Sequence, residues 1–170
     1  MTEILLARHG ETDWNLEHRV QGHTDRPLNA TGIEQARALA DRLAAVPLVA
    51  VYASDLVRAH DTAVIVAGLH GLDVIVDIDL REKNFGTWEG LTDVEILERF
   101  PNAVRGRWGD AETTEAVARR AIAAIDRIRA LHPAGTVLVV SHGGPLRAIL
   151  AHLGVEHGPI GNCDVFRIDY

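Results

Sequence analysis

The sequence predicts an α/β protein, a three-layer α/β/α sandwich in which helices cover both faces of a mainly parallel sheet. Short β-branched runs alternate along the chain with longer segments whose apolar residues recur every three or four positions, a pattern typical of strands joined by helical crossovers. The apolar runs are continuous, as expected for strands buried on both faces. The chain has 170 residues, 47% of them hydrophobic, and it shows no repeat, low-complexity tract or linker. We therefore predict a single domain over residues 1–170.

Five segments are predicted to be strands. Their short length and β-branched content distinguish them from the helical segments. They are EILLA (3–7), VAVYA (49–53), VIVDI (74–78), VLVVS (137–141) and the last segment, DVFRIDY (164–170).

Four helices are expected between these strands. In residues 31–46 the apolar positions keep helical spacing, and Thr31 with Glu34 forms a capping box that would start the helix. A second helix is expected over 54–68, capped by Ser54 or Asp55 and ended near Gly68.

The other two helices have equally clear boundary signals. Residues 112–132 carry a helical apolar stripe that Pro133 stops, and residues 143–154 have Pro145 near the first position and Gly154 at the end. Residues 79–111 are the least regular part and are expected to form a loop with short helices over one edge of the sheet.

Composition excludes several kinds of partner. The formal net charge is −7, which argues against nucleic acid or an anionic membrane held by bulk charge. Cys163 is the only cysteine, so no intrachain disulfide can form. The N-terminal segment lacks the features of a signal peptide, and no apolar stretch is long enough to span a bilayer. We expect a cytoplasmic protein. The sequence does not decide between a monomer and a homodimer.

Reactive side chains follow the predicted strands at the ends where open α/β sheets bind ligands. Two of these ends carry a histidine followed by glycine, and the other two lead to an arginine and to an arginine–glutamate pair. The residues are Arg8-His9-Gly10, Arg58, Arg81-Glu82 and Ser141-His142-Gly143-Gly144.

This set of side chains suits a phosphoryl group. Arginines bind phosphate oxygens, a histidine nitrogen can attack phosphorus, and a carboxylic acid can protonate the leaving oxygen. Helix N-termini near residues 55 and 145, and the backbone amide of Gly143, would add donors for an anion. We expect Arg8 to lower the pKa of His9 and Gly10 to leave room for the anion.

Five motifs, in order, resemble those of the histidine phosphatase superfamily in its phosphoglycerate mutase-like branch. The resemblance covers the chain from about residue 3 to its C-terminal end, and its specificity lies in the order and placement of the motifs. They are LLARHGETDWN, QGHTDRPLNATGIEQA, YASDLVRAHDTA, LREKNFGTWEG and VVSHGGPLRAIL.

The resemblance implies a role for each matching residue. His9 would be the nucleophile that forms a phosphohistidine, and Glu82 the general acid and then the base. Arg8, Arg58 and His142 would bind the transferred phosphoryl group, with His142 cationic or hydrogen-bonding.

Further positions complete the implied site. Asn15 matches an asparagine that contacts phosphate, and Gln21 and Gly22 match a loop beside the pocket. The resemblance implies no metal and no cofactor, and a small phosphate ester as the partner. Glu89 is an alternative acid in the same irregular loop as Glu82, although a structural role is the stronger expectation. The remaining histidines lack metal-ligand spacing.

Within this family the leading interpretation is a phosphomonoesterase. A phosphoglycerate mutase is the main alternative, and Arg99, Arg105 and Arg107 would then contact an acidic substrate. Two features favour water as the acceptor of the phosphoryl group. Only about 30 residues separate Glu82 from the helix expected near residue 112, and His142-Gly143-Gly144 stands where mutases have His-Gly-Asn. A phosphohistidine phosphatase and a non-catalytic domain that binds phosphate esters remain as further alternatives.

Overall fold

A five-stranded sheet of order β3-β2-β4-β1-β5 forms the centre of the computed structural model, which describes residues 2–102 and 110–169. Four strands are parallel, and β5 pairs antiparallel with β1. The strands are β1 (Thr2–Arg8), β2 (Leu48–Ala53), β3 (Val74–Val76), β4 (Gly135–Ser141) and β5 (Val165–Asp169). The sheet is thus mainly parallel, as predicted.

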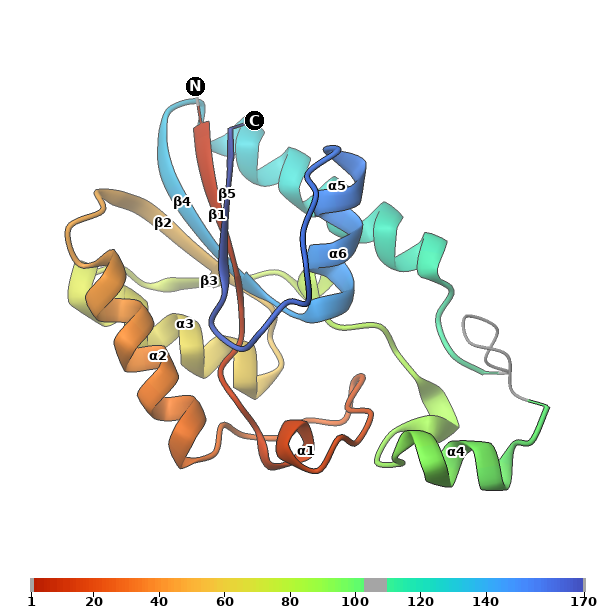
Figure 1. Cartoon of the computed structure of the whole chain (residues 1–170). Helices are drawn as coiled ribbons and strands as arrows, with labels where there is room; N and C mark the ends of the chain where they lie inside the picture. The colour runs from red at the N-terminus through yellow and green to blue at the C-terminus, as the bar shows by residue number, and fades with distance from the viewer. Residues whose placement is uncertain (1, 103–109, 170) are drawn as a thin grey trace.

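Two pairs of helices cover the sheet (Figure 1). On one face lie α2 (Ala30–Leu43) and α3 (Val57–His70), and on the other α5 (Thr114–Leu131) and α6 (Gly143–His152). This arrangement confirms the predicted three layers.

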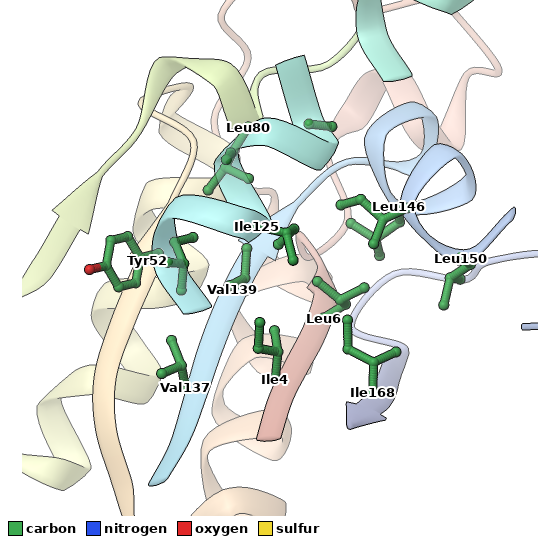
Figure 2. Packing of buried hydrophobic residues seen from close by; sticks show 14 of the residues in the cluster. Ile4, Leu6, Tyr52, Leu80, Ile125, Val137, Val139, Leu146, Leu150 and Ile168 are labelled. Atoms are coloured by element: carbon green, nitrogen blue, oxygen red, sulfur yellow. The ribbon is translucent and has the colours of Figure 1, made fainter. Parts of the chain in front are cut away.

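The alternation of side chains along each strand divides the core into two clusters. In β1, Leu5 and Ala7 pack with residues of α2 and α3, whereas Ile4 and Leu6 pack with residues of α5 and α6 (Figure 2). Ile4 and Leu6 are completely buried, and burial of such a side chain stabilises the fold by about 1.5–3 kcal/mol. A central strand with apolar residues on both faces accounts for the continuous run in the sequence.

Short elements lie beyond the carboxyl ends of the parallel strands. They are α1 (Asp13–Leu16), the 3₁₀ helices η1 (Ile78–Leu80) and η2 (Gly86–Trp88), and α4 (Asp93–Arg99). Trp88, Leu91 and Ile96 form a small core of their own with Val20 and Phe85. Among the described residues of 79–111, the expected loop with short helices is therefore confirmed.

The predicted capping box of α2 is wrong. Asn29 is the N-cap, and its Oδ1 accepts a hydrogen bond of 2.8 Å from Gly32 N. Asn29 also donates 2.9 Å to the Glu11 carboxylate. This contact fixes Asn29 in the extended conformation of a cap, so the helix starts before Thr31.

The predicted boundaries of α3 are also wrong. The helix starts at Val57 with Leu56 as its N-cap, while Asp55 pairs through both carboxylate oxygens with Arg81 at 2.7 and 2.5 Å. It ends at His70, followed by the C-cap Gly71 with a φ of 63°. The Asp55 carboxylate binds Arg81, which lies 26 residues later, instead of capping the helix. The local sequence does not show this contact, so it indicated the wrong cap.

The third strand is shorter and less buried than predicted. It ends at Val76, and 44% of Ile75 and 46% of Val76 remain exposed. β3 lies at the edge of the sheet and pairs only with β2. An edge strand has a neighbour on one side, so its apolar run does not imply burial on both faces.

Gly32 is required by a close approach between backbones. A methyl group there would lie 2.1 Å from the Glu11 carbonyl oxygen. We expect Gly32→Ala to lower the free energy of unfolding by about 1–3 kcal/mol, because the overlap outweighs the higher helix propensity of alanine. The control is Gly68→Ala in α3, where a methyl group meets no atom within 4 Å and should stabilise by about 1 kcal/mol. Urea unfolding of the three proteins measures both effects, and equal midpoints would contradict the first.

Candidate active site

His9 and His142 lie side by side because their strands are neighbours. Arg8, the last residue of β1, pairs with Ser141, the last residue of β4, and His9 N donates 3.0 Å to the Ser141 carbonyl. His9 and His142 are the next residues along the chain, and the centroids of their imidazole rings are 5.1 Å apart, with the ring planes inclined at 58°. The predicted convergence of these two strand ends is therefore confirmed.

Hydrogen bonds fix the tautomer of His9. Its Nδ1 donates 2.7 Å to the Gly10 carbonyl oxygen, and this leaves Nε2 with its lone pair when the ring is neutral. The carbonyl of His9 accepts 2.9 Å from Asn162 Nδ2, and only 3% of the residue is exposed. The ring is thus held with one nitrogen available for attack.

Burial and positive charge keep both imidazoles neutral. The pKa of His9 is lowered well below its usual value, first by burial and then by the charges of Arg58 and Arg8. The pKa of His142 is lowered in the same way, by burial and then by Arg58. The predicted effect of Arg8 on His9 has the correct sign but follows burial and Arg58 in size. The cationic form of His142 is disfavoured in this environment, and hydrogen bonding is the role its ring can serve.

These shifts predict that stability falls in mild acid. An unfolded histidine has a pKa near 6.5, and both folded values lie below it. Below about pH 6.5 the unfolded chain therefore binds more protons than the native one, so the free energy of unfolding decreases by up to about 1.4 kcal/mol per pH unit for each histidine. Urea titrations in phosphate-free buffer between about pH 8 and 5 measure this slope, and His142→Gln should reduce it. A constant free energy of unfolding over this range would contradict the shifts.

Arg58 lies completely buried in the first turn of α3. Its guanidinium donates 2.7 Å to the Gly22 carbonyl and 3.1 Å to the Thr24 carbonyl. Burial lowers its pKa to about 10, so the group remains charged at neutral pH. Gly22 has a φ of 54°, and a methyl group there would lie 2.1 Å from Glu89 Oε1. The predicted Gly22 thus supports Arg58 through its carbonyl.

Several buried nitrogen atoms of this cluster have no hydrogen-bond partner in the described parts of the chain. They are Arg8 Nε, Arg58 Nε, and Nδ1 and Nε2 of His142. Arg8 uses another nitrogen, Nη1, to donate 2.6 Å to the Ile160 carbonyl. Buried polar groups are normally satisfied, and an anion placed beside His9 is the ligand that these cationic and neutral donors suit.

Glu82 lies at the N-terminus of α6. Both of its carboxylate oxygens accept 3.2 Å hydrogen bonds from Gly144 N, and Oε1 accepts 2.8 Å from Lys83 N. Its charge raises the pKa of Arg8 and of Arg58, so it acts on both arginines. The structure brings Glu82 to the same site as the histidines.

Arg120 of α5 holds the segment that carries Glu82. Its guanidinium donates to the carbonyls of Asp79, Arg81 and Glu82 at 2.7, 2.5 and 2.9 Å, and it pairs with Glu112 at 2.7 Å. The sequence did not identify this residue, because Arg119 and Arg120 are adjacent arginines in the same helix and nothing in the local sequence shows which of them faces Glu82.

Glu89 has the structural role expected of it. Its carboxylate accepts 2.9 and 3.0 Å from the backbone of His23 and Phe85. It also accepts 2.8 and 2.6 Å from the backbone and hydroxyl of Thr24. A carboxylate with four such partners is a scaffold for the 21–24 loop.

Asn15 and Gln21 belong to a polar network around α1. Asn15 Oδ1 accepts 3.1 Å from Thr12 N, and Thr12 Oγ1 accepts 3.2 Å from Asn15 N, so the two residues form a capping box. Asn15 Oδ1 also accepts 3.3 Å from Asn162 Nδ2. Gln21 Oε1 accepts 2.9 Å from Thr12 Oγ1. Asn162, which bridges Asn15 and the His9 carbonyl, was missed because nothing in its local sequence marks it.

The two glycines after the histidines differ in their surroundings. A methyl group at Gly10 would lie 2.5 Å from the Gly32 carbonyl oxygen, so the missing side chain permits the approach of α2. The expectation that it makes room for an anion is corrected accordingly. Gly143 is the first residue of α6, next to the N-cap His142.

Within residues 2–102 and 110–169, no group of three or more His, Cys, Asp or Glu side chains is placed to hold a metal ion. None of the described helices has the length and apolarity needed to cross a membrane.

Comparison with known proteins identifies relatives along the whole chain. The model of the histidine phosphatase superfamily (branch 1) matches residues 4–170. The metal-independent phosphoserine phosphatase of Arabidopsis thaliana is 39% identical over 160 residues, 88% of this chain and 67% of the relative. The probable phosphoglycerate mutase GpmB of Escherichia coli O1:K1 / APEC is 35% identical over 184 residues, 100% of this chain and 86% of the relative.

Solved structures share the fold closely. YhfR of Bacillus stearothermophilus superimposes with a TM-score of 0.92 at 35% identity, over 99% of this chain and 91% of its own. A mycobacterial glucosyl-3-phosphoglycerate phosphatase complexed with VO3 gives 0.89 at 32% identity, over 98% and 90%. A mutant phosphoserine phosphatase of Entamoeba histolytica, in complex with phosphoserine, gives 0.84 at 29% identity, over 98% and 90%.

Proposed function

Because the chain belongs to branch 1 of the histidine phosphatase superfamily, we propose that it is a metal-independent phosphomonoesterase. It hydrolyses a small phosphorylated metabolite through a phosphohistidine on His9. The observation that carries this proposal is the neutral His9, whose Nδ1 donates a hydrogen bond to the Gly10 carbonyl. It lies beside Arg8 Nε and Arg58 Nε, which are buried and have no partner within residues 2–102 and 110–169. A nucleophile with a free lone pair next to several buried nitrogen donors suits phosphoryl transfer.

In the first step, His9 Nε2 attacks phosphorus while Arg8, Arg58 and His142 hold the phosphoryl oxygens. The N–P bond forms as the ester P–O bond breaks, and Glu82 in its acid form gives its proton to the leaving oxygen. Charge developing on the phosphoryl oxygens meets donors that are already in place.

In the second step, water attacks the phosphohistidine. Glu82, now a carboxylate, accepts a proton from this water, the N–P bond breaks, and inorganic phosphate leaves. His9 and protonated Glu82 are thereby regenerated. The hydrogen bonds from Gly144 N and Lys83 N to Glu82 keep its carboxyl group in one position for both transfers.

Glu82→Gln tests the acid role through the leaving group. A glutamine cannot donate a proton to an alkoxide, so we expect kcat/KM to fall by about 10²-fold or more for alkyl phosphates. The fall should be only a few-fold for dinitrophenyl phosphate, whose leaving group needs little protonation. Equal slowing across a series of aryl and alkyl phosphates would rule out the acid role.

Phosphate release tests the function as a whole. Wild type and His9→Ala are assayed in EDTA with p-nitrophenyl phosphate and a panel of metabolites that includes 3-phosphoglycerate. Turnover by the wild type alone supports the proposal, whereas no release by folded wild type contradicts it.

A phosphoglycerate mutase is the second candidate, and the similarity to GpmB over the whole chain favours it. Of the arginines considered for an acidic substrate, Arg99 lies at the exposed end of α4, while Arg105 and Arg107 lie outside the described residues. Interconversion of phosphoglycerates primed by a bisphosphoglycerate, without net phosphate release, would replace hydrolysis by mutase activity.

A further inference from the structure

A cavity of about 480 Å³ opens beside Glu82. It lies between the loop that follows Glu82, the first turn of α5 and the outer face of α6. Its walls are largely apolar, with Phe85, Val117 and Ala148 among them, and two cationic side chains, Lys83 and Arg147, also line it.

Glu82 links this cavity to the proposed reaction. The acid must reach the ester oxygen, so the rest of the leaving group lies on the side of the phosphate where Glu82 stands. Because Glu82 and Gly144, which hydrogen-bonds to it, both line the cavity, the leaving group enters this space. The cavity is therefore the subsite where leaving groups are distinguished, and this step rests on the proposed function.

Arg147 differs from the paired arginines of this chain in having no carboxylate partner among the described residues. Arg19, Arg81, Arg120, Arg127 and Arg167 each form an ion pair with a carboxylate. Arg147 is exposed, and no hydrogen bond or ion pair to it occurs within residues 2–102 and 110–169. In a protein of net charge −7, an arginine that lines a cavity without a carboxylate partner is available to a ligand.

The guanidinium of Arg147 lies toward the phosphate site. A methyl group on Gly143, one turn earlier in α6, would lie 3.2 Å from Arg147 Nη1. The charge of Arg147 also lowers the pKa of Arg8, so the two groups are near enough to interact. An anion that Arg147 binds in the cavity would thus lie near the residues proposed to hold the phosphoryl group.

We propose that Arg147 is a specificity residue that binds a carboxylate on the leaving group of the substrate. A single guanidinium fork matches the two oxygens of a planar carboxylate. The apolar walls contributed by Phe85, Val117 and Ala148 contact the body of the leaving group. The preferred substrates are phosphate esters whose leaving group combines an acid with an apolar body.

Two probes that differ in one charge test this inference. They are 4-carboxyphenyl phosphate and its methyl ester, 4-(methoxycarbonyl)phenyl phosphate, and the measured quantity is the ratio of their kcat/KM values. We expect Arg147→Met to lower the ratio by about 10- to 100-fold, the range for a lost charged hydrogen bond. Arg147→Lys keeps the charge without the fork and should give an intermediate ratio.

Arg119→Met is the matched control. Arg119 is another exposed arginine, on α5, and it does not line the cavity, so its loss removes one positive charge without touching the subsite. The ratio should equal that of the wild type.

The outcomes separate the inference from the proposed function. An unchanged ratio in Arg147→Met, with both probes still hydrolysed, overturns the role of Arg147 and leaves the phosphatase intact. An equal fall of the ratio in Arg119→Met also overturns it, because general charge would then explain the preference. Failure of the wild type to hydrolyse either probe or to form phosphohistidine removes the proposed function, and the inference with it.

Discussion

Replacing His9 by alanine is expected to abolish turnover. The substitution removes the nitrogen, His9 Nε2, whose lone pair is left available for attack by the hydrogen bond from Nδ1 to the Gly10 carbonyl. Loss of a covalent nucleophile lowers kcat by at least about 10³-fold in enzymes of known mechanism. The measurement is phosphate release in EDTA, together with trapping of acid-labile phosphohistidine from a labelled substrate.

The control for His9→Ala is His132→Ala. His132 lies at the C-terminus of α5 and contacts Tyr52 OH at 2.9 Å. The next strand, β4, starts nearby at Gly135, which is the end of this strand opposite to Ser141 and the candidate site. This variant should keep its activity. Label on phosphohistidine in His9→Ala, or turnover at the wild-type rate, would show that another residue is the nucleophile.

Arg58→Met is expected to lower kcat/KM by about 10²- to 10³-fold, the effect of removing one preorganised donor from a developing negative charge. Methionine has a similar length and no charge, and the pKa of Arg58, about 10, means that a cation is lost at neutral pH. The same variant should lose the stabilisation that inorganic phosphate gives the wild type, because a ligand that binds only the native state stabilises it by RT ln(1 + [L]/Kd), and this quantity falls as Kd rises. Thermal unfolding with and without phosphate measures this loss.

Arg127→Met controls for the removal of an arginine. Arg127 pairs with Asp77 and Asp79 at the surface, away from the phosphoryl site, so activity and phosphate stabilisation should both persist. If Arg58→Met retained the full phosphate effect, the guanidinium would be a structural clamp for Gly22 and Thr24 and no more.

Much of the fold could be predicted because local signals and global packing agree. The continuous apolar runs of β1 and β4 indicate strands buried on both faces, and both lie inside the sheet. β3 has the same composition but lies at the edge, and its position depends on the strand order, which the sequence does not display. The cap of α2 depends on the contact between Asn29 and Glu11, which local propensity cannot foresee.

In the candidate site too, some residues could be predicted from the sequence and others could not. His9 and His142 follow strands and are each adjacent to glycine, so their convergence could be predicted from the rule for parallel sheets. Arg120 and Asn162 act through the backbones of Glu82 and His9. Their contribution arises from tertiary contacts and becomes visible only in the folded chain.

The position of β1 in the sheet has a consequence for the order of folding. β1 is the first strand in the chain, yet its two neighbours, β4 and β5, are the last two. The partner of the His9 carbonyl, Asn162, follows 153 positions later. Contacts between residues so far apart in the sequence form slowly. During synthesis on the ribosome, β1 has neither of its partner strands until β2, α3 and α5 have been made. The nucleophile is therefore fixed late, and we expect catalytic competence to appear together with native structure, with no active intermediate before it.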